Sequence, residues 1–263
     1  MKKYWLFFKA NVDFYFVYRL SFILWRVRNI LGFLIIYFLW SSIYSGKTVV
    51  FNYTQEQMIT YVLAISFTNA LIIASRTTDI ASEIVSGDII NYLLRPVSFF
   101  SLVITKELAD KIVNGIAAVI EIVLLVLIFQ PHIFIQQNLS VYPFVFAALL
   151  IGAAITFFLS LSLSFIAFWT SEVWAPRFIY FVLISMFAGT FFPLDILPPL
   201  LYNFLLATPF PYLIYLPTKI YLTGISGDNI KLLGIGIIWA VVFYFVAKKI
   251  WQKGLMEFSF YGK

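Results

Sequence analysis

The stretch EQMITYVLAISFTNALIIAS, residues 56–75, is one of several runs of about 20 mostly apolar residues in this chain. An α-helix of that length can cross the hydrocarbon core of a bilayer, because it satisfies its own backbone hydrogen bonds. The composition supports this interpretation: 62% of the residues are hydrophobic and 11% are charged. Soluble domains usually carry about 25% charged residues. We therefore predict an all-α integral membrane protein with a single domain over residues 1–263.

The same criterion predicts six transmembrane helices. Their approximate ranges are 23–45, 56–75, 108–130, 141–169, 177–192 and 231–250. Residues 1–20 contain Lys9, Asp13 and Arg19 and lack a continuous apolar core. Apolar residues recur there at helical spacing, which predicts an amphipathic helix at the membrane interface. A frayed basic tail is the alternative.

The positions of Lys and Arg residues predict the orientation. If the N-terminus is cytoplasmic, all but three of the 18 basic residues fall on the inner side, and the exceptions are Lys47, Lys219 and Lys231. Short cytoplasmic segments carry an excess of Lys and Arg. We therefore expect a multi-pass membrane protein with both termini and the loop 76–107 in the cytoplasm; the bacterial cell (inner or plasma) membrane is implied only by the family resemblance given below.

Residues 189–224 are apolar but rich in proline. The prolines are Pro193, Pro198, Pro199, Pro209, Pro211 and Pro217. Proline breaks helices, and unsatisfied backbone cannot face hydrocarbon. We predict a re-entrant pair of short helices on the outer side, packed against the other helices. A seventh, kinked span is the alternative, but it would place the basic C-terminus outside.

Catalytic and cofactor motifs are weak in this sequence. The tetrapeptide SGKT at 45–48 resembles the end of a phosphate-binding loop, but Ser41 stands where the pattern needs glycine. His132 has no acidic or cysteine neighbour in its short loop, and the chain contains no cysteine. We therefore predict a protein that is not itself an enzyme, binds no metal or cofactor and has no nucleic-acid partner.

Glu121, Ser160 and Ser164 are polar candidate site residues inside predicted spans. Glu121 lies within the third span, where a carboxylate costs roughly 2.5 kcal/mol or more unless it has a partner or a wet cavity. It either lines a substrate path or a dimer seam, or it is a snorkelling or neutral side chain. Ser160 and Ser164 lie one turn apart in the fourth span. They indicate close helix packing or, alternatively, the wall of a polar cavity.

The stretch SEIVSGDIINYLLRPVS, residues 82–98, is polar and helical in a chain built for lipid. Apolar residues from Ile80 onwards form one stripe, Gly87 permits a bend, and the Arg95–Pro96 pair ends the helix. Such a helix either rests on lipid or docks in a groove of a partner. The candidate contact residues are Asp79, Glu83, Ile84, Gly87, Asp88, Ile89, Leu93, Leu94, Arg95 and Pro96.

The stretch IASEIVSGDIINYLLRPVS, from Ile80 to Ser98, resembles the cytoplasmic coupling loop of permease subunits of type-two ABC transporters. The likeness is to the small bacterial branch that lacks a fused ATPase. The N-terminal YRLSFILWRVRN, the six spans and the external proline-rich segment fit the same family, so the resemblance covers nearly the whole chain.

This resemblance implies a permease of an ATP-driven exporter. Two permease chains, identical or paralogous, would each dock on a separate ABC ATPase subunit through residues 79–96, with the N-terminal helix near 1–18 as a second candidate contact. ATP and Mg²⁺ would be bound by the partner. The substrate, whether drug-like, lipid or glycan, would leave the cytoplasm or the inner leaflet.

Two other classes of protein compete with this interpretation. A membrane scaffold or assembly protein could use the same amphipathic loop to hold a cytoplasmic partner without transport. A secondary transporter would need inverted repeats and ion ligands near the midplane. Glu121 is the only acidic residue deep in a predicted span, which argues against the secondary transporter.

Overall fold

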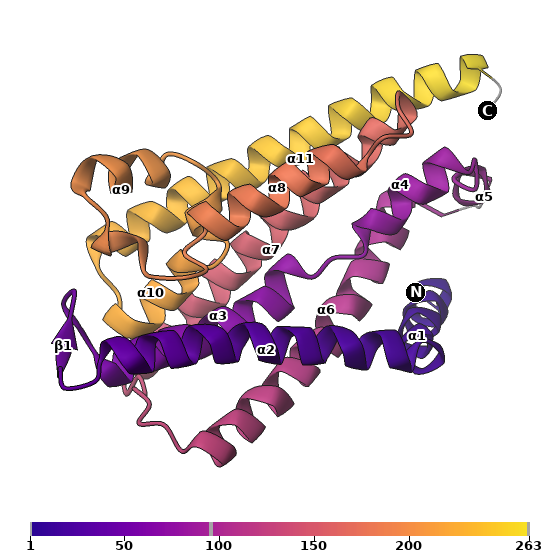
Figure 1. Cartoon of the computed structure of the whole chain (residues 1–263). Coiled ribbons are helices and arrows are strands. Elements are labelled where there is room, and N and C mark those ends of the chain that lie inside the picture. The colour runs from indigo at the N-terminus through magenta and orange to yellow at the C-terminus, as the bar shows by residue number, and fades with distance from the viewer. Residues whose placement is uncertain (1, 95–96, 262–263) are drawn as a thin grey trace.

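The computed structural model describes residues 2–94 and 97–261, and most of this part of the chain is helical (Figure 1). The α-helices are α1 (Lys2–Val17), α2 (Arg19–Ile43), α3 (Gln55–Thr68), α4 (Thr77–Val85), α5 (Ile90–Leu93), α6 (Phe99–Phe129), α7 (Tyr142–Phe165), α8 (Trp174–Phe187), α9 (Pro199–Leu206), α10 (Tyr215–Thr223) and α11 (Gly227–Tyr261). A π-helical turn, η1 (Asn69–Ile73), continues α3. Four 3₁₀ turns are η2 (Leu139–Val141), η3 (Ile166–Phe168), η4 (Leu194–Ile196) and η5 (Phe210–Tyr212).

A short antiparallel pair, β1 (Val49–Val50) and β2 (Tyr53–Thr54), joins α2 to α3. Thr54 then starts α3 with a capping box: its side chain accepts from the Gln57 backbone N–H, and the Gln57 side chain accepts from the Thr54 N–H. Residues 45–48, the SGKT match, lie in the turn before β1, and no helix follows them directly. This context differs from the strand–loop–helix of a phosphate-binding loop.

Within the described residues, five helical runs are long and apolar enough to cross a membrane. They are Arg19–Ile43, Gln55–Val85, Phe99–Phe129, Leu139–Phe168 and Gly227–Phe258. Each contains most of one predicted span, so the all-α membrane fold is confirmed. The third run begins at Phe99, about two turns before the predicted start at 108.

The fifth predicted span, 177–192, corresponds to α8, which is shorter than expected. It has 14 residues and is therefore about 21 Å long, against a hydrocarbon core of about 30 Å. Gly189 lies just beyond its end with φ +84°, and a Cβ there would lie 2.7 Å from the Tyr61 hydroxyl. The close approach of Tyr61 thus requires glycine at the point where the chain leaves α8.

The predicted pair of short helices between α8 and α11 is present as α9 and α10. The four residues from Tyr212 to Tyr215, which connect η5 to α10, are completely buried. Their backbone therefore faces protein and not lipid, as a non-helical segment in a membrane requires. A single kinked span is not what the chain forms here.

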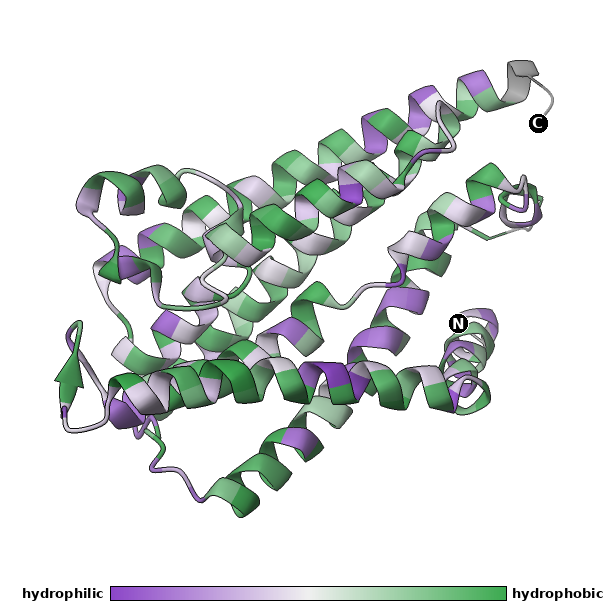
Figure 2. Ribbon diagram, in the orientation of Figure 1, coloured by the Kyte–Doolittle hydropathy of each residue, from purple (hydrophilic) through white to green (hydrophobic). Residues whose placement is uncertain are grey.

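The helices run between two ends of the molecule (Figure 1). One end, here called the α4 end, carries α1, α4, α5 and the C-terminal part of α11. The opposite end, here called the hairpin end, carries β1, α9 and α10. The predicted N-terminal helix is α1, which crosses the end of α2 and packs against α6. The long helices are hydrophobic along most of their length (Figure 2).

Candidate functional site

The junction between α3 and α4 is an ordered break. The chain passes through η1 and leaves helical conformation before α4 begins at Thr77. Lys111 of α6 donates to two carbonyl oxygens next to this break, those of Ile72 (2.8 Å) and Ala74. Its ammonium group also lies 3.0 Å from the carboxylate of Glu107. Because π-helical turns often mark functional bends, we regard this break as a joint that depends on Lys111.

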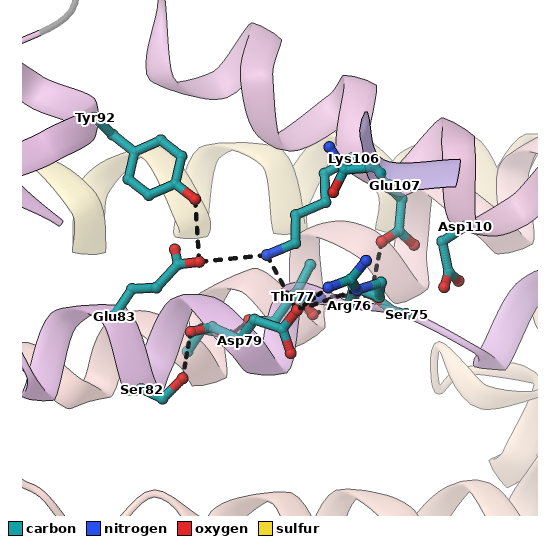
Figure 3. A network of polar contacts seen from close by, with 12 residues as sticks. Ser75, Arg76, Thr77, Asp79, Ser82, Glu83, Tyr92, Lys106, Glu107 and Asp110 are labelled. Carbon is teal, nitrogen blue, oxygen red and sulfur yellow. Dashed lines mark hydrogen bonds and ion pairs between the residues drawn. The ribbon is translucent and has the colours of Figure 1, made fainter. Parts of the chain in front are cut away.

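A charged network connects α4 to α6 beyond this joint (Figure 3). The carboxylate of Asp79 forms ion pairs with the guanidinium of Arg76, at 3.0 Å, and with the ammonium group of Lys106, at 3.1 Å. Lys106 also lies 3.3 Å from Glu83, and the Tyr92 hydroxyl donates to Glu83 at 3.1 Å. One lysine of α6 thus holds two successive turns of α4.

This network shows that Asp79 and Glu83, two of the candidate contact residues, have partners within the chain. Both face Lys106, whose side chain is 10% exposed. The physical reason is the early start of α6 at Phe99, which makes Lys106 part of a helix packed beside α4 and not part of a loop. Charged residues between 76 and 107 therefore bind α4 to α6 within the chain, besides forming part of its surface. We call the contacts of Lys106 with Asp79 and Glu83 the Lys106 clamp.

The apolar stripe of the loop divides into two halves. Ile80, Ile84 and Ile89 are buried in a cluster that includes Phe165 of α7 and Trp251 of α11. This half anchors α4 to the chain's own membrane helices, so it is not available to lipid or to a partner. The expectation of one continuous docking stripe is corrected accordingly.

The second half of the stripe is exposed. Ile90 and Leu93 are each 41% exposed, and Leu94 is 78% exposed. These side chains belong to α5 and its end, where the chain turns back towards α6 at the α4 end of the molecule (Figure 1). An exposed apolar group carried by a short helix fits contact with another molecule.

Gly87 forms the turn between the two halves. Its φ is +83°, a conformation that glycine adopts without strain. No atom lies within 4 Å of an added Cβ, so backbone conformation and not crowding requires glycine here. Asp88 is exposed and accepts from the Ser86 hydroxyl at 2.7 Å. Arg95 and Pro96 lie outside the described residues.

Arg76 also links the N-terminal helix to this site. Its guanidinium lies 4.0 Å from the centre of the Phe14 ring of α1. The neighbouring Tyr15 donates to the carboxylate of Asp110 on α6. Arg76, which directly precedes α4, therefore brings the start of α4 into contact with α1.

Glu121 has a partner within the chain. Its carboxylate lies 3.4 Å from Arg26 of α2, and both residues are buried. Arg26 donates to the side-chain oxygen of Asn114 at 3.1 Å. The sequence placed Arg26 among the cytoplasmic charges, whereas the structure places it inside the α2–α6 contact. A buried pair of opposite charges explains how both residues are accommodated between apolar helices.

Ser164 is fully buried at the meeting point of three helices. Its hydroxyl lies 2.8 Å from the carbonyl oxygens of Thr77 and Ser160 and accepts from Arg177 of α8 at 2.8 Å. Ser164 thus joins α7 to the start of α4 and to α8, in agreement with a packing role. No pattern in the sequence predicts this contact of Arg177.

A cavity of about 570 Å³ lies between α2, the end of α3 with η1, α7 and α8. Its polar lining residues include Arg28, Asn29, Ser75, Ser160 and Arg177. Its apolar lining residues include Phe33, Ile36, Ile65, Ile184 and Phe191. Ser160 therefore lies on a cavity wall. Glu121 and Ser164 are not among the cavity-lining residues of the part of the chain that the structure describes.

A second polar cluster closes the hairpin end. The Tyr53 hydroxyl lies within 3.0 Å of both Asp195 oxygens, and Lys219 lies 3.7 Å from the same carboxylate. Lys219 also donates to the hydroxyls of Tyr202 and Tyr215, both at 2.9 Å. Burial, together with the negative charge of Asp195, raises the pKa of Tyr53, so its hydroxyl stays protonated and donates. This cluster joins β2 to η4, α9 and α10.

These features define a multi-pass helical membrane protein with a clamped amphipathic helix at one end and a cavity among its spans. Residues 30–262 match the family described as ABC-2 family transporter protein. Because the match covers most of the chain, the protein belongs to this family of membrane transport components. A search of curated proteins finds no match. The resemblance inferred from residues 80–98 is thus confirmed at the family level.

Proposed function

We propose that this chain is the transmembrane subunit of an ATP-driven exporter. It pairs with a second permease chain, identical or paralogous, and each chain docks on a separate ABC ATPase subunit that binds ATP and Mg²⁺. The α4 end lies in the cytoplasm of a bacterial cell, and the substrate leaves the cytoplasm or inner leaflet. Membership of the ABC-2 family and the concentration of basic residues at the α4 end support this proposal.

The observation that carries the proposal is the construction of α4 and α5. The buried half of the stripe and the Lys106 clamp fix α4 to the membrane helices, whereas Leu93 and Leu94 point an apolar group away from them. A force applied to α5 therefore passes through α4 to the joint at η1. That joint contributes Asn69, Ala70 and Ile73 to the cavity wall. The contact surface and the cavity are parts of one continuous element.

The proposal is tested with Leu94→Glu in the complex that copurifies with its ATPase from native membranes. A charge at this 78% exposed position should weaken ATPase binding about tenfold or more, because apolar contacts at the centre of an interface carry most of its energy. ATPase activity and substrate export should fall together. The measurement is ATP turnover and transport in proteoliposomes.

The matched control is Leu139→Glu. Leu139 is 80% exposed but lies at the hairpin end, so the same charge should leave ATP turnover unchanged. If Leu94→Glu binds the ATPase and transports as the wild type does, the coupling assignment is wrong. If an ATPase copurifies but its turnover never depends on this chain, the scaffold interpretation is correct instead.

A further inference from the structure

The cavity wall carries positive charge and no negative charge. Arg28 of α2 and Arg177 of α8 both line it, and no Asp or Glu does so among the described residues. Arg28 is exposed and lies over the ring of Trp25 at 4.8 Å. Arg177 uses one nitrogen on Ser164, and its Nε is buried without a hydrogen-bond partner. Both guanidinium groups therefore retain donors for an anion.

The nearby carboxylates are already occupied. Asp79 is held by Arg76 and Lys106, and Glu121 is held by Arg26. No ion pair to Arg28 or Arg177 occurs within residues 2–94 and 97–261, although Asp79 contributes an electrostatic attraction to Arg177. Arg28 and Arg177 are thus cavity-lining charges that form no ion pair within these residues.

Apolar side chains line much of the rest of the cavity, which reaches the surface. Phe33, Ile65 and Ile184 line its interior and are buried. At its rim, Ile35 is 71% exposed and Phe181 is 50% exposed, so the cavity opens between α2 and α8. An apolar chain can therefore enter from the side, while the arginines lie towards the α4 end.

We propose that the cavity binds an amphiphile with an anionic headgroup, such as a phosphate, and one or more apolar chains. The headgroup contacts Arg28 and Arg177, because guanidinium groups match phosphate and carboxylate oxygens in charge and geometry. The apolar chain lies along Phe33, Ile65 and Ile184. This inference names the substrate class for the exporter proposed above. Binding in the cavity is argued independently, and only the statement that the bound molecule is a transport substrate rests on the proposed function. A wall with two positive side chains and no negative one disfavours a cationic drug.

The test measures lipid binding by the delipidated full-length chain in detergent with native mass spectrometry. The probes are phosphatidylglycerol, phosphatidylcholine with the same acyl chains, and inorganic phosphate. We expect the wild type to prefer phosphatidylglycerol and the variant R28Q/R177Q to bind it at least about tenfold more weakly, because hydrogen bonds to charged groups are the strong ones. Inorganic phosphate should not compete, since it has no apolar chain. Competition by phosphate at similar concentration would overturn the amphiphile in favour of a small anion.

Two further variants keep the test decisive. Arg19→Gln removes an exposed arginine from the same helix but outside the cavity, and it should bind phosphatidylglycerol as the wild type does. Arg28→Gln alone cannot disturb the Ser164 contact of Arg177, and it should still weaken binding. Equal binding of the two lipids by the wild type, or equal loss in Arg19→Gln and Arg28→Gln, would overturn the proposal. Binding needs no ATPase, so its outcome is independent of the coupling experiment.

Discussion

The pair formed by Arg26 and Glu121 places two opposite charges among the apolar helices of the membrane part of the chain. Each charge alone would be expensive among apolar helices, and together they offset much of that cost. Their separation of 3.4 Å and the additional contact to Asn114 show that the pair belongs to the α2–α6 contact. Glu121 is therefore explained by structure before any role in transport is needed.

A double-mutant cycle tests this explanation. Arg26→Met should lower the free energy of unfolding in detergent by roughly 3–5 kcal/mol, because it leaves a buried carboxylate without its partner. Glu121→Met should cost a similar amount. The double variant should recover most of the loss, and chemical unfolding of the three variants and the wild type measures the coupling. Losses that simply add in the double variant would mean that the two residues are independent.

At the scale of elements, the joint between α3 and α4 depends on Lys111. Lys111→Met removes the donor to Ile72 and Ala74 and leaves Glu107 without its ion pair. We expect hydrogen exchange of the amides in residues 74–85 to rise about tenfold or more, because unsatisfied buried polar groups cost about 1–3 kcal/mol each. Hydrogen exchange with mass spectrometry measures this directly.

The control for the joint is Lys248→Met, an exposed lysine of α11 at the same end of the molecule. Its exchange pattern in 74–85 should match the wild type. Unchanged protection in Lys111→Met would show that α6 packing alone, and not the lysine, holds the break.

The elements also show what could be read from the sequence. Long apolar runs predict five of the crossing helices, because length and hydropathy are local properties. The helix α6 begins at Phe99, before the predicted span, and the charges of Lys106 and Glu107 are satisfied there by α4 and by Lys111. Arg26 was missed because only the fold reveals that Glu121 lies beside it.

At the scale of the whole molecule, the two ends have different chemistry. The α4 end combines the Lys106 clamp, the exposed Leu93 and Leu94 and the cavity's arginines, while the hairpin end is closed by Tyr53, Asp195 and their neighbours. Such polarity suits a transporter that is driven from one side and sealed on the other. The coupling proposal depends on the orientation in the membrane, because α4 and α5 must face the cytoplasm to meet an ATPase.

Single cysteines test that orientation without background, because the natural chain contains none. Ser86→Cys and Ser171→Cys place an exposed thiol at the α4 end, and Ser140→Cys places one at the hairpin end. In intact cells, a membrane-impermeant maleimide should label Ser140→Cys and leave the other two unlabelled, because it cannot reach the cytoplasm. In permeabilised cells all three should be labelled, which controls for accessibility. Labelling of Ser86→Cys in intact cells would place α4 and α5 outside the cell, where no ATPase could drive them.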